Sequence, residues 1–104
     1  MKIYAFEVRK DEIEYFDSLS ALPGIELELH PEGLTMDHIR NLENGSGVSI
    51  LGMYHYRKPE LDLMKKQNVH FLSTRTIGYN HIDIEYAKQI GIHVCNARYD
   101  PHGV

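Results

Sequence analysis

The chain has 104 residues, 11 Lys and Arg against 15 Asp and Glu, and a formal net charge of −4. Its length fits one domain, and its 42% hydrophobic and 25% charged residues exclude collagen-like, disordered and disulfide-scaffold classes. Lys and Arg are scattered, so the basic stripe that nucleic acids require is missing, and no apolar run approaches the ~20 residues of a membrane helix. With a lone Cys95 and no signal-peptide pattern at Met1–Arg9, we expect a soluble cytoplasmic protein without nucleic-acid or membrane partners.

Strand-like and helix-like patterns alternate along the chain. In chain order they predict a strand at 2–8, a helix at 11–20, a strand at 25–29, a helix at 34–42, a strand at 48–52, a helix at 59–67, a strand at 69–73, a helix at 83–90 and a strand at 92–95. Thr35 and Asp83 are typical helix caps, while Pro23-Gly24 and Gly91 are typical breaks. This alternation with short loops predicts an α/β fold, a parallel sheet with helices on both faces.

Three loops are predicted to leave the carboxyl ends of late strands, at 52–58, 74–81 and 96–101, and they are rich in Arg and Tyr. Ligands of open α/β sheets bind outside this edge, and Arg, Tyr and backbone amides suit a small carboxylate. Gly78, in the middle loop, would let the backbone approach an anion closely. The alternative is that the loops are polar only because they are exposed, and that the middle loop is a plain strand-to-helix turn.

The segment at 73–83, STRTIGYNHID, resembles the R-x-x-G-x-[DN]-x-[IV]-D signature of the D-2-hydroxyacid dehydrogenase family. The match continues through Ala87-Lys88-x-x-Gly91-Ile92-x-Val94-x-Asn96 and Tyr99-x-Pro101. Asp100 replaces the Ser usual in the last step, which bears on substrate preference. The resemblance is closest to the D-lactate dehydrogenase branch. It follows the whole chain in order of elements and is specific from about Leu72 to Pro101.

The resemblance implies a two-domain enzyme about three times longer than this chain. Residues 1–104 would form the amino-terminal part of a flavodoxin-like substrate domain, and an NAD-binding Rossmann domain would follow Val104. The full-length protein, commonly a homodimer in this family, would reduce a small 2-oxo acid to the 2-hydroxy acid with NADH, most directly pyruvate to D-lactate. Branched or aromatic oxo acids are the next candidates.

Site residues are also implied by the resemblance. The backbone amides of Ile77 and Gly78 would hold the substrate carboxylate, and Tyr99 would pack at the substrate side chain. The opposite wall would be formed by a short loop, Gly52, Met53 and Tyr54. Asn80 and Asp83 would be structural, tying the loop to the start of the next helix.

Other parts of the family's machinery are expected elsewhere. The catalytic Arg, Glu and His lie in the family's NAD domain, so no catalytic residue is expected before Val104. Gly45-Ser46-Gly47 lacks the third glycine of a dinucleotide fingerprint and precedes a strand rather than opening a helix. We therefore expect this chain alone to be inactive and to bind no NAD. It should also expose an apolar face where the last helix of the domain and the partner domain would dock.

Other classes of protein fit the sequence less well. The seven His are scattered, with His93 and Cys95 giving the only ligand-like spacing, so a metal site is disfavoured and Cys95 is expected to be a small core residue. A phosphoacceptor receiver domain fails because the third predicted strand ends in Gly52-Met53, not in Asp. A non-catalytic ligand-binding or interaction module stays open, with Tyr54-His55-Tyr56-Arg57 as a possible contact patch.

Overall fold

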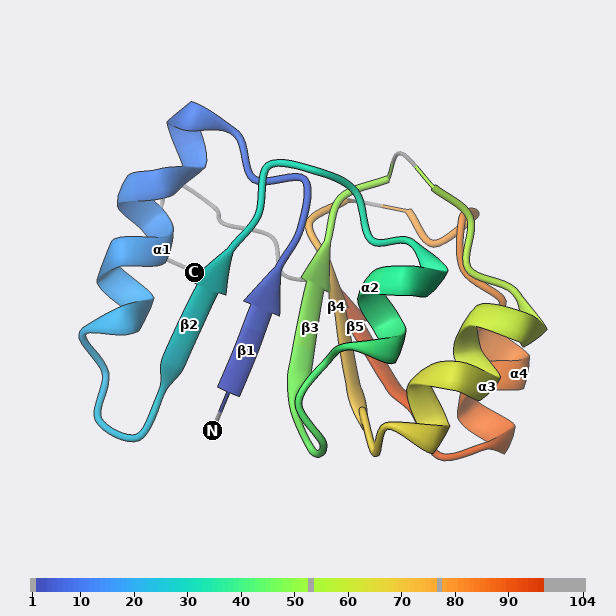
Figure 1. Ribbon diagram of the computed structural model, residues 1–104. Coiled ribbons are helices and arrows are strands. Elements are labelled where there is room, and N and C mark those ends of the chain that lie inside the picture. Colours follow the sequence, from blue (N-terminus) through green and yellow to red (C-terminus); the bar gives the residue numbers. More distant parts are fainter. Residues whose placement is uncertain (1, 53, 77, 97–104) are drawn as a thin grey trace.

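Five parallel strands form a sheet in the order β2-β1-β3-β4-β5 (Figure 1). The computed structural model describes residues 2–52, 54–76 and 78–96. Its strands are β1 (Lys2–Ala5), β2 (Glu26–Leu29), β3 (Gly47–Ile50), β4 (Phe71–Thr74) and β5 (His93–Asn96). The predicted parallel α/β fold is confirmed, and this strand order is that of flavodoxin-like sheets.

Helices cover the two faces of the sheet unequally. A short 3-10 helix, η1 (Lys10–Glu12), leads into α1 (Ile13–Ser20) on one face, while α2 (Met36–Arg40), α3 (Lys58–Lys66) and α4 (Ile84–Gln89) lie on the other (Figure 1). Crossovers between parallel strands are right-handed. The connection from β1 to β2 crosses the sheet in one direction and the later connections cross it in the opposite direction, so α1 lies opposite to α2, α3 and α4.

Local sequence signals fix the helix ends. At the start of α2, the Thr35 hydroxyl accepts the N–H of His38 at 3.5 Å, and at the start of α4 the Asp83 carboxylate accepts the N–H of Tyr86 at 3.2 Å. Gly91 follows α4 with φ +87°, a left-handed conformation that glycine adopts without strain. Both predicted caps and the predicted stop are confirmed.

The first strand ends at Ala5, whereas a strand through Val8 was predicted. Glu7 has φ +57°, which is rare for a residue with a Cβ and turns the chain out of the strand. The N–H of Glu7 donates to the carbonyl of Glu32 at 2.8 Å, and that of Val8 to the carbonyl of His30 at 3.0 Å. These contacts are made by the segment after β2, so composition around the strand could not reveal them.

The main core lies between the sheet and the α2–α4 layer. Its largest fully buried side chains include Phe6, Ile39, Ile50, Leu61, Met64 and Leu72. Leu61 and Met64 face inward as helical spacing predicts. On α1, Phe16 is buried as expected, but Ile13 is 44% exposed because it begins the helix, beside Leu29 at the end of β2.

The α1 face of the sheet is only partly covered within the described residues. Beside α1 lies an apolar hollow of about 290 Å³, lined by Ile3, Phe16, Leu27 and Phe71 among others, and Phe71 is 49% exposed. Cys95 is half-buried, so its prediction as a core residue is wrong. That prediction assumed both faces of the last strand to be covered.

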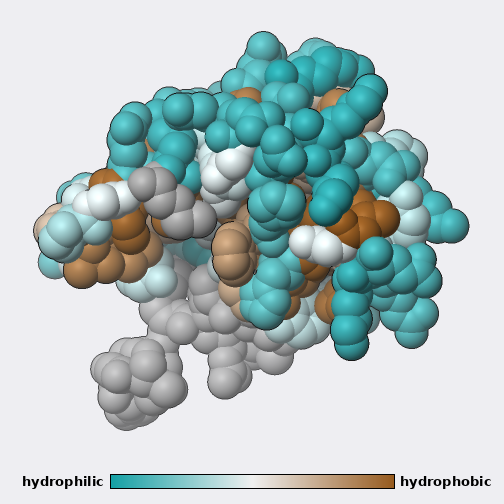
Figure 2. Space-filling model, turned by 90° about the horizontal axis from the view of Figure 1, so that it is seen from below, coloured by the Kyte–Doolittle hydropathy of each residue, from teal (hydrophilic) through white to brown (hydrophobic). Residues whose placement is uncertain are grey.

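The end of the molecule at which the strands begin has a mostly hydrophilic surface. Figure 2 looks at the edge where the strands begin and shows hydrophilic residues over most of that face, with apolar residues at the left, on the α1 side, and in further patches right of the centre. Among the described residues, no helix is long and apolar enough to cross a membrane.

Candidate functional site

The candidate site lies at the carboxyl edge of the sheet. The chain leaves β1 toward β2 on one side, and β3 pairs with β1 on the other, so the strand order reverses between β1 and β3. A crevice opens at such a point because the two connections diverge, and ligands of this fold class bind there. Among the described residues, segments that reach this edge are 6–8, 51–52, 54–57, 75–76 and 78–83.

The loops after β3 and β4 are joined to each other. The N–H of Tyr56 donates to the carbonyl of His81 at 2.7 Å, and the N–H of Asp83 donates to the carbonyl of Tyr56 at 3.0 Å, which makes an isolated parallel bridge between Tyr56 and Ile82. At Gly52, a Cβ would lie 3.3 Å from the Cγ2 of Thr76. Two loops that are separate in sequence therefore form one surface.

Three of the predicted substrate-binding residues are described by the structure. Gly52, Tyr54 and Gly78 are exposed at this edge. The Tyr54 ring lies against Gly33, where a Cβ would come within 1.8 Å of the ring atom Cε2. The glycine after β2 therefore makes room for the aromatic side chain after β3.

The other predicted substrate-binding residues, Met53, Ile77 and Tyr99, lie outside the described residues. Gly78 itself has open space where a Cβ would be and does not have a positive φ. Neither local packing nor backbone strain therefore requires glycine at this position.

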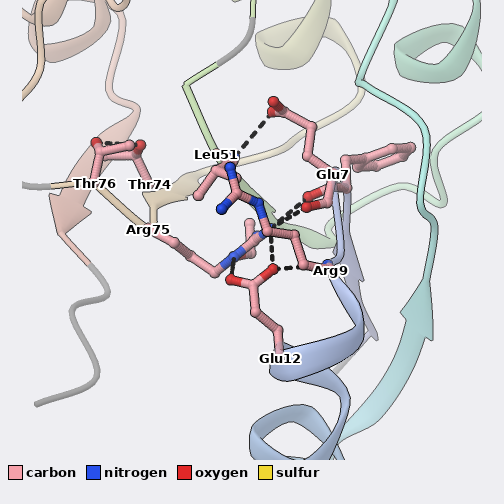
Figure 3. A network of polar contacts seen from close by, with 9 residues as sticks. Glu7, Arg9, Glu12, Leu51, Thr74, Arg75 and Thr76 are labelled. Atoms are coloured by element: carbon pink, nitrogen blue, oxygen red, sulfur yellow. Dashed lines mark hydrogen bonds and ion pairs between the residues drawn. The ribbon is translucent and has the colours of Figure 1, made fainter.

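Arg75 was expected to be part of a polar rim, and that expectation is wrong. Its side chain is 1% exposed, and its Nε donates to the Glu12 carboxylate at 2.8 Å (Figure 3). Its Nη1 donates to the hydroxyl of Ser49 at 2.9 Å, and its Nη2 donates to the carbonyls of Phe6 at 2.8 Å and Glu7 at 3.0 Å. Arg75 thus ties η1, β1 and β3 together beneath the site.

Glu7 also lies at this edge and has a structural role that its sequence context did not indicate. Its side chain is buried, and its Oε2 accepts the N–H of Leu51 at 3.0 Å, just after β3 (Figure 3). Because its carbonyl also accepts from Arg75, Glu7 connects the ends of β1, β3 and β4. The available signal was its place directly after the first strand, next to the point where the strand order reverses.

Burial controls the titration of two side chains in these loops. The pKa of Tyr56 is raised, chiefly because the side chain is buried, with a smaller contribution from the charge of Glu7. The pKa of His81 is lowered, first by burial and then by the neighbouring His55 and Arg57, against an opposing effect of Glu7. His81 is therefore neutral at neutral pH, and its Nε2 lies 2.8 Å from the hydroxyl oxygen of Thr74.

The proposed contact patch at residues 54–57 is only partly supported. Tyr56 is 1% exposed and its hydroxyl donates to the carbonyl of Leu34 at 3.4 Å, so it belongs to the core. Tyr54, His55 and Arg57 are exposed. The Arg57 guanidinium donates to the carbonyl of Asn80 at 3.4 Å, which is a further link between the two loops.

No group of three or more His, Cys, Asp or Glu residues in the described part of the chain is arranged to hold a metal ion. His30 and His38, which sequence spacing did not connect, both lie 3.6 Å from the Glu32 carboxylate. The His93 ring packs against Phe71, with ring centroids 5.7 Å apart.

The described residues do not form a dinucleotide cradle either. Gly45 has φ +83° in the turn before β3, and Gly47 begins that strand. This glycine pair therefore lies at the amino end of a strand, whereas a pyrophosphate is held where a strand's carboxyl end leads into a helix.

Strand order, reversal point and joined loops together define a flavodoxin-like domain with a candidate ligand site at its carboxyl edge. The family model "D-isomer specific 2-hydroxyacid dehydrogenase, catalytic domain" matches residues 3–104. The chain belongs to this family.

Individual relatives support the same assignment. The chain is 36% identical over 105 residues to an aromatic 2-oxoacid reductase of Clostridium sporogenes (strain ATCC 15579), covering 100% of this chain and 32% of that protein. It is 31% identical, with the same coverage, to a D-2-hydroxyacid dehydrogenase (NAD+) of Lacticaseibacillus paracasei. The apo structure of Escherichia coli D-lactate dehydrogenase superposes with a TM-score of 0.84 at 24% identity, covering 97% of this chain and 32% of the other. The chain thus spans about a third of the length of the curated relatives it matches.

Proposed function

We propose that this chain is the amino-terminal part of the substrate domain of an NAD-dependent D-2-hydroxyacid dehydrogenase, which reduces a small 2-oxo acid to the D-2-hydroxy acid. The observation that carries this proposal is the meeting of the loops of Gly52 and Thr76 at the carboxyl edge of the sheet, beside the point where the strand order reverses between β1 and β3. The family signature falls on one of these two loops, at residues 75–83.

The role of the chain is to bind and orient the substrate carboxylate. The Thr76–Gly78 loop offers backbone amides, which bind carboxylates through short charge-assisted hydrogen bonds. The open space at Gly78 leaves room for a ligand to reach the backbone. The Arg75 guanidinium is buried in an ion pair with Glu12, so it is not available to bind a substrate carboxylate.

NAD is proposed as the cofactor of the full-length protein, supplying the hydride, and the relative from Lacticaseibacillus paracasei carries NAD+ in its name. The residues described here do not fit it, because the glycines of the Gly45–Gly47 turn lie at the wrong edge of the sheet. We therefore assign NAD binding and the acid–base residues to the remainder of the protein. We expect the full-length protein to be a homodimer. The exposed apolar hollow beside α1 is proposed to be covered by that remainder.

Pyruvate is the substrate expected from the resemblance to D-lactate dehydrogenases. An aromatic 2-oxo acid is the second candidate, because the relative at 36% identity is an aromatic 2-oxoacid reductase. Comparison of kcat/KM for pyruvate, 2-oxo-4-methylpentanoate and phenylpyruvate in the full-length protein separates the two. Preference for phenylpyruvate would replace the lactate assignment by the aromatic one.

The substrate-binding assignment is tested by a matched pair of glycine substitutions in the full-length enzyme. Gly78→Ala adds a methyl group into open space without strain, so stability should be unchanged or slightly higher while the KM for the 2-oxo acid rises and the KM for NADH does not. Gly24→Ala also meets open space, but at φ +78°, so it should lower stability and leave both KM values alone. An unchanged 2-oxo acid KM in Gly78→Ala would remove Gly78 from the site.

The rival proposal is a non-catalytic ligand-binding or interaction module. It predicts that the coding sequence of the protein contains no Gly-x-Gly-x-x-Gly segment followed by Arg, Glu and His in order after residue 104, and that purified protein shows no NADH oxidation with any 2-oxo acid. Either result would refute the dehydrogenase proposal for this polypeptide.

A further inference from the structure

A line of hydrogen bonds runs from a buried imidazole to the candidate substrate loop. His81 is 9% exposed, and its Nε2 lies 2.8 Å from the Thr74 hydroxyl oxygen. That oxygen lies 2.8 Å from the hydroxyl oxygen of Thr76 (Figure 3), which in turn donates to the carbonyl of Gly78 at 2.7 Å. We call these four residues the His81 relay.

Chemistry fixes the direction of every bond in the His81 relay. A carbonyl oxygen can only accept, so the Thr76 hydroxyl proton points to Gly78. A hydroxyl has one proton, so the bond between the two threonines is donated by Thr74. The Thr74 oxygen must then accept from His81, which requires the proton on Nε2.

From this geometry we infer that His81 is a positioning residue, which through Thr74 and Thr76 holds the Gly78 carbonyl and thereby the backbone of Gly78, whose N–H is proposed to bind the substrate carboxylate. This inference rests on the proposed function. It assigns His81 no contact with the substrate and no proton transfer.

Packing among the described residues gives the backbone at Gly78 little restraint, so a hydrogen bond to its carbonyl matters there. Gly78 has no neighbour within 4 Å of the place of its missing Cβ and no special φ, and glycine has more conformational freedom than any other residue. When Thr76 holds the Gly78 carbonyl, it limits rotation about the Cα–C bond of Gly78 and so restrains the backbone that carries the Gly78 N–H.

The backbone at His81 and the side chain of Thr74, where the His81 relay begins, are themselves held in place. The carbonyl of His81 accepts the N–H of Tyr56, and Thr74 is the last, fully buried residue of β4. The charged or titratable groups that act on the His81 ring are Glu7, His55 and Arg57. Protonation of His81 would add a proton at Nδ1 and leave the Nε2 donor intact, so the relay persists in both charge states.

The test uses steady-state kinetics of the full-length enzyme with the best 2-oxo acid of the substrate panel. His81→Leu and Thr76→Val should each raise the 2-oxo acid KM about fivefold, the effect of about one hydrogen bond, with kcat and the NADH KM changed by less than about twofold. His81→Gln, whose Nε2 is as many bonds from Cα as that of His, should restore the KM to within about twofold of the parent value. The matched control is His70→Leu, an exposed His just before β4 at the opposite edge, and it should leave KM unchanged.

A double substitution separates the relay from two independent effects. His81→Leu and Thr74→Val interrupt the same line, so the double variant should show no larger KM than His81→Leu alone. Multiplied effects, an unchanged KM in His81→Leu, or no recovery in His81→Gln would overturn the inference. If His81→Leu does not fold, Thr76→Val decides, because its unchanged KM would equally overturn the relay. A parent enzyme without activity refutes the proposed function, whereas an active parent with insensitive variants refutes the relay alone.

Discussion

The buried pair of Arg75 and Glu12 gives the sharpest prediction about stability. Arg75→Met keeps much of the side-chain volume and removes the guanidinium, which makes two bonds to Glu12, one to Ser49 and two to the carbonyls at the end of β1. The two side chains are 1% and 2% exposed, so the Glu12 carboxylate would stay buried, with its bond to the N–H of Arg9 but without the Arg75 guanidinium.

Removing one partner of a buried ion pair costs about 3–5 kcal/mol, and we expect Arg75→Met to fall in that range. For a domain of this size, with a urea dependence of about 1.5 kcal/mol per M, the unfolding midpoint should fall by roughly 2–3 M. The assay is equilibrium urea unfolding of the purified protein. Arg57→Met is the matched control, because Arg57 is exposed and its guanidinium contacts are 3.4 and 3.5 Å long, so it should change stability by about 0.5 kcal/mol or less.

A double-mutant cycle tests the pairing itself. Glu12→Gln keeps the shape of the side chain, and the double variant Glu12→Gln with Arg75→Met should be less destabilised than the sum of the two single variants. An Arg75→Met variant no less stable than Arg57→Met, or additive losses in the cycle, would refute the argument that a buried pair anchors η1 to the sheet.

Further predictions concern the loops around the site and one helix cap. Gly33→Ala should displace the Tyr54 ring and alter the ratio of kcat/KM for phenylpyruvate and pyruvate, and an unaltered ratio would exclude Tyr54 as a wall of the substrate site. Because burial lowers the pKa of His81 below its ordinary value of 6.5, the unfolded chain binds more protons below about pH 6.5. The stability from neutral His81 is complete above that pH and lost as pH falls through the folded pKa. His81→Gln should flatten this part of the urea midpoint profile, and an equally steep profile would contradict the cause given. Asp83→Ala should cost about 1 kcal/mol by removing the cap of α4, and urea unfolding should show no loss if the cap is unimportant.

The sequence predicted the fold well because the signals for α/β architecture are local. Period-two and helical spacing located every strand and every helix within a few residues, and the caps at Thr35 and Asp83 are found where they were expected. The predicted length of an element was wrong where hydrogen bonds to a distant segment determine the backbone conformation. The clearest case is Glu7, whose left-handed conformation is held by Glu32 after β2.

The sequence predicted that two loops meet at the carboxyl edge of the sheet, but not which side chains hold them there. Parallel strands bring their carboxyl ends to one edge, so the loops at 52–58 and 74–81 could be placed together from order alone. The sequence could not predict that Arg75 is buried, because its partner Glu12 lies far away in sequence. Whether an Arg side chain is exposed to solvent or forms a buried ion pair depends on the tertiary contacts around it. The burial of His81 could not be predicted for the same reason.

Taken alone, the sequence determined the alternation of strands and helices, the helix caps and the family signature at residues 75–83, because each of these depends on neighbours within one element or one loop. Only the tertiary structure decided which residues are buried in the fold and which remain exposed at the candidate site. Burial made Arg75, Glu12 and His81 internal groups, while Gly78 and Tyr54 were left at the open edge. The physical reason is that the cost of removing a charge or a hydrogen-bonding group from water is set by contacts between distant segments, and composition along the chain does not contain those contacts.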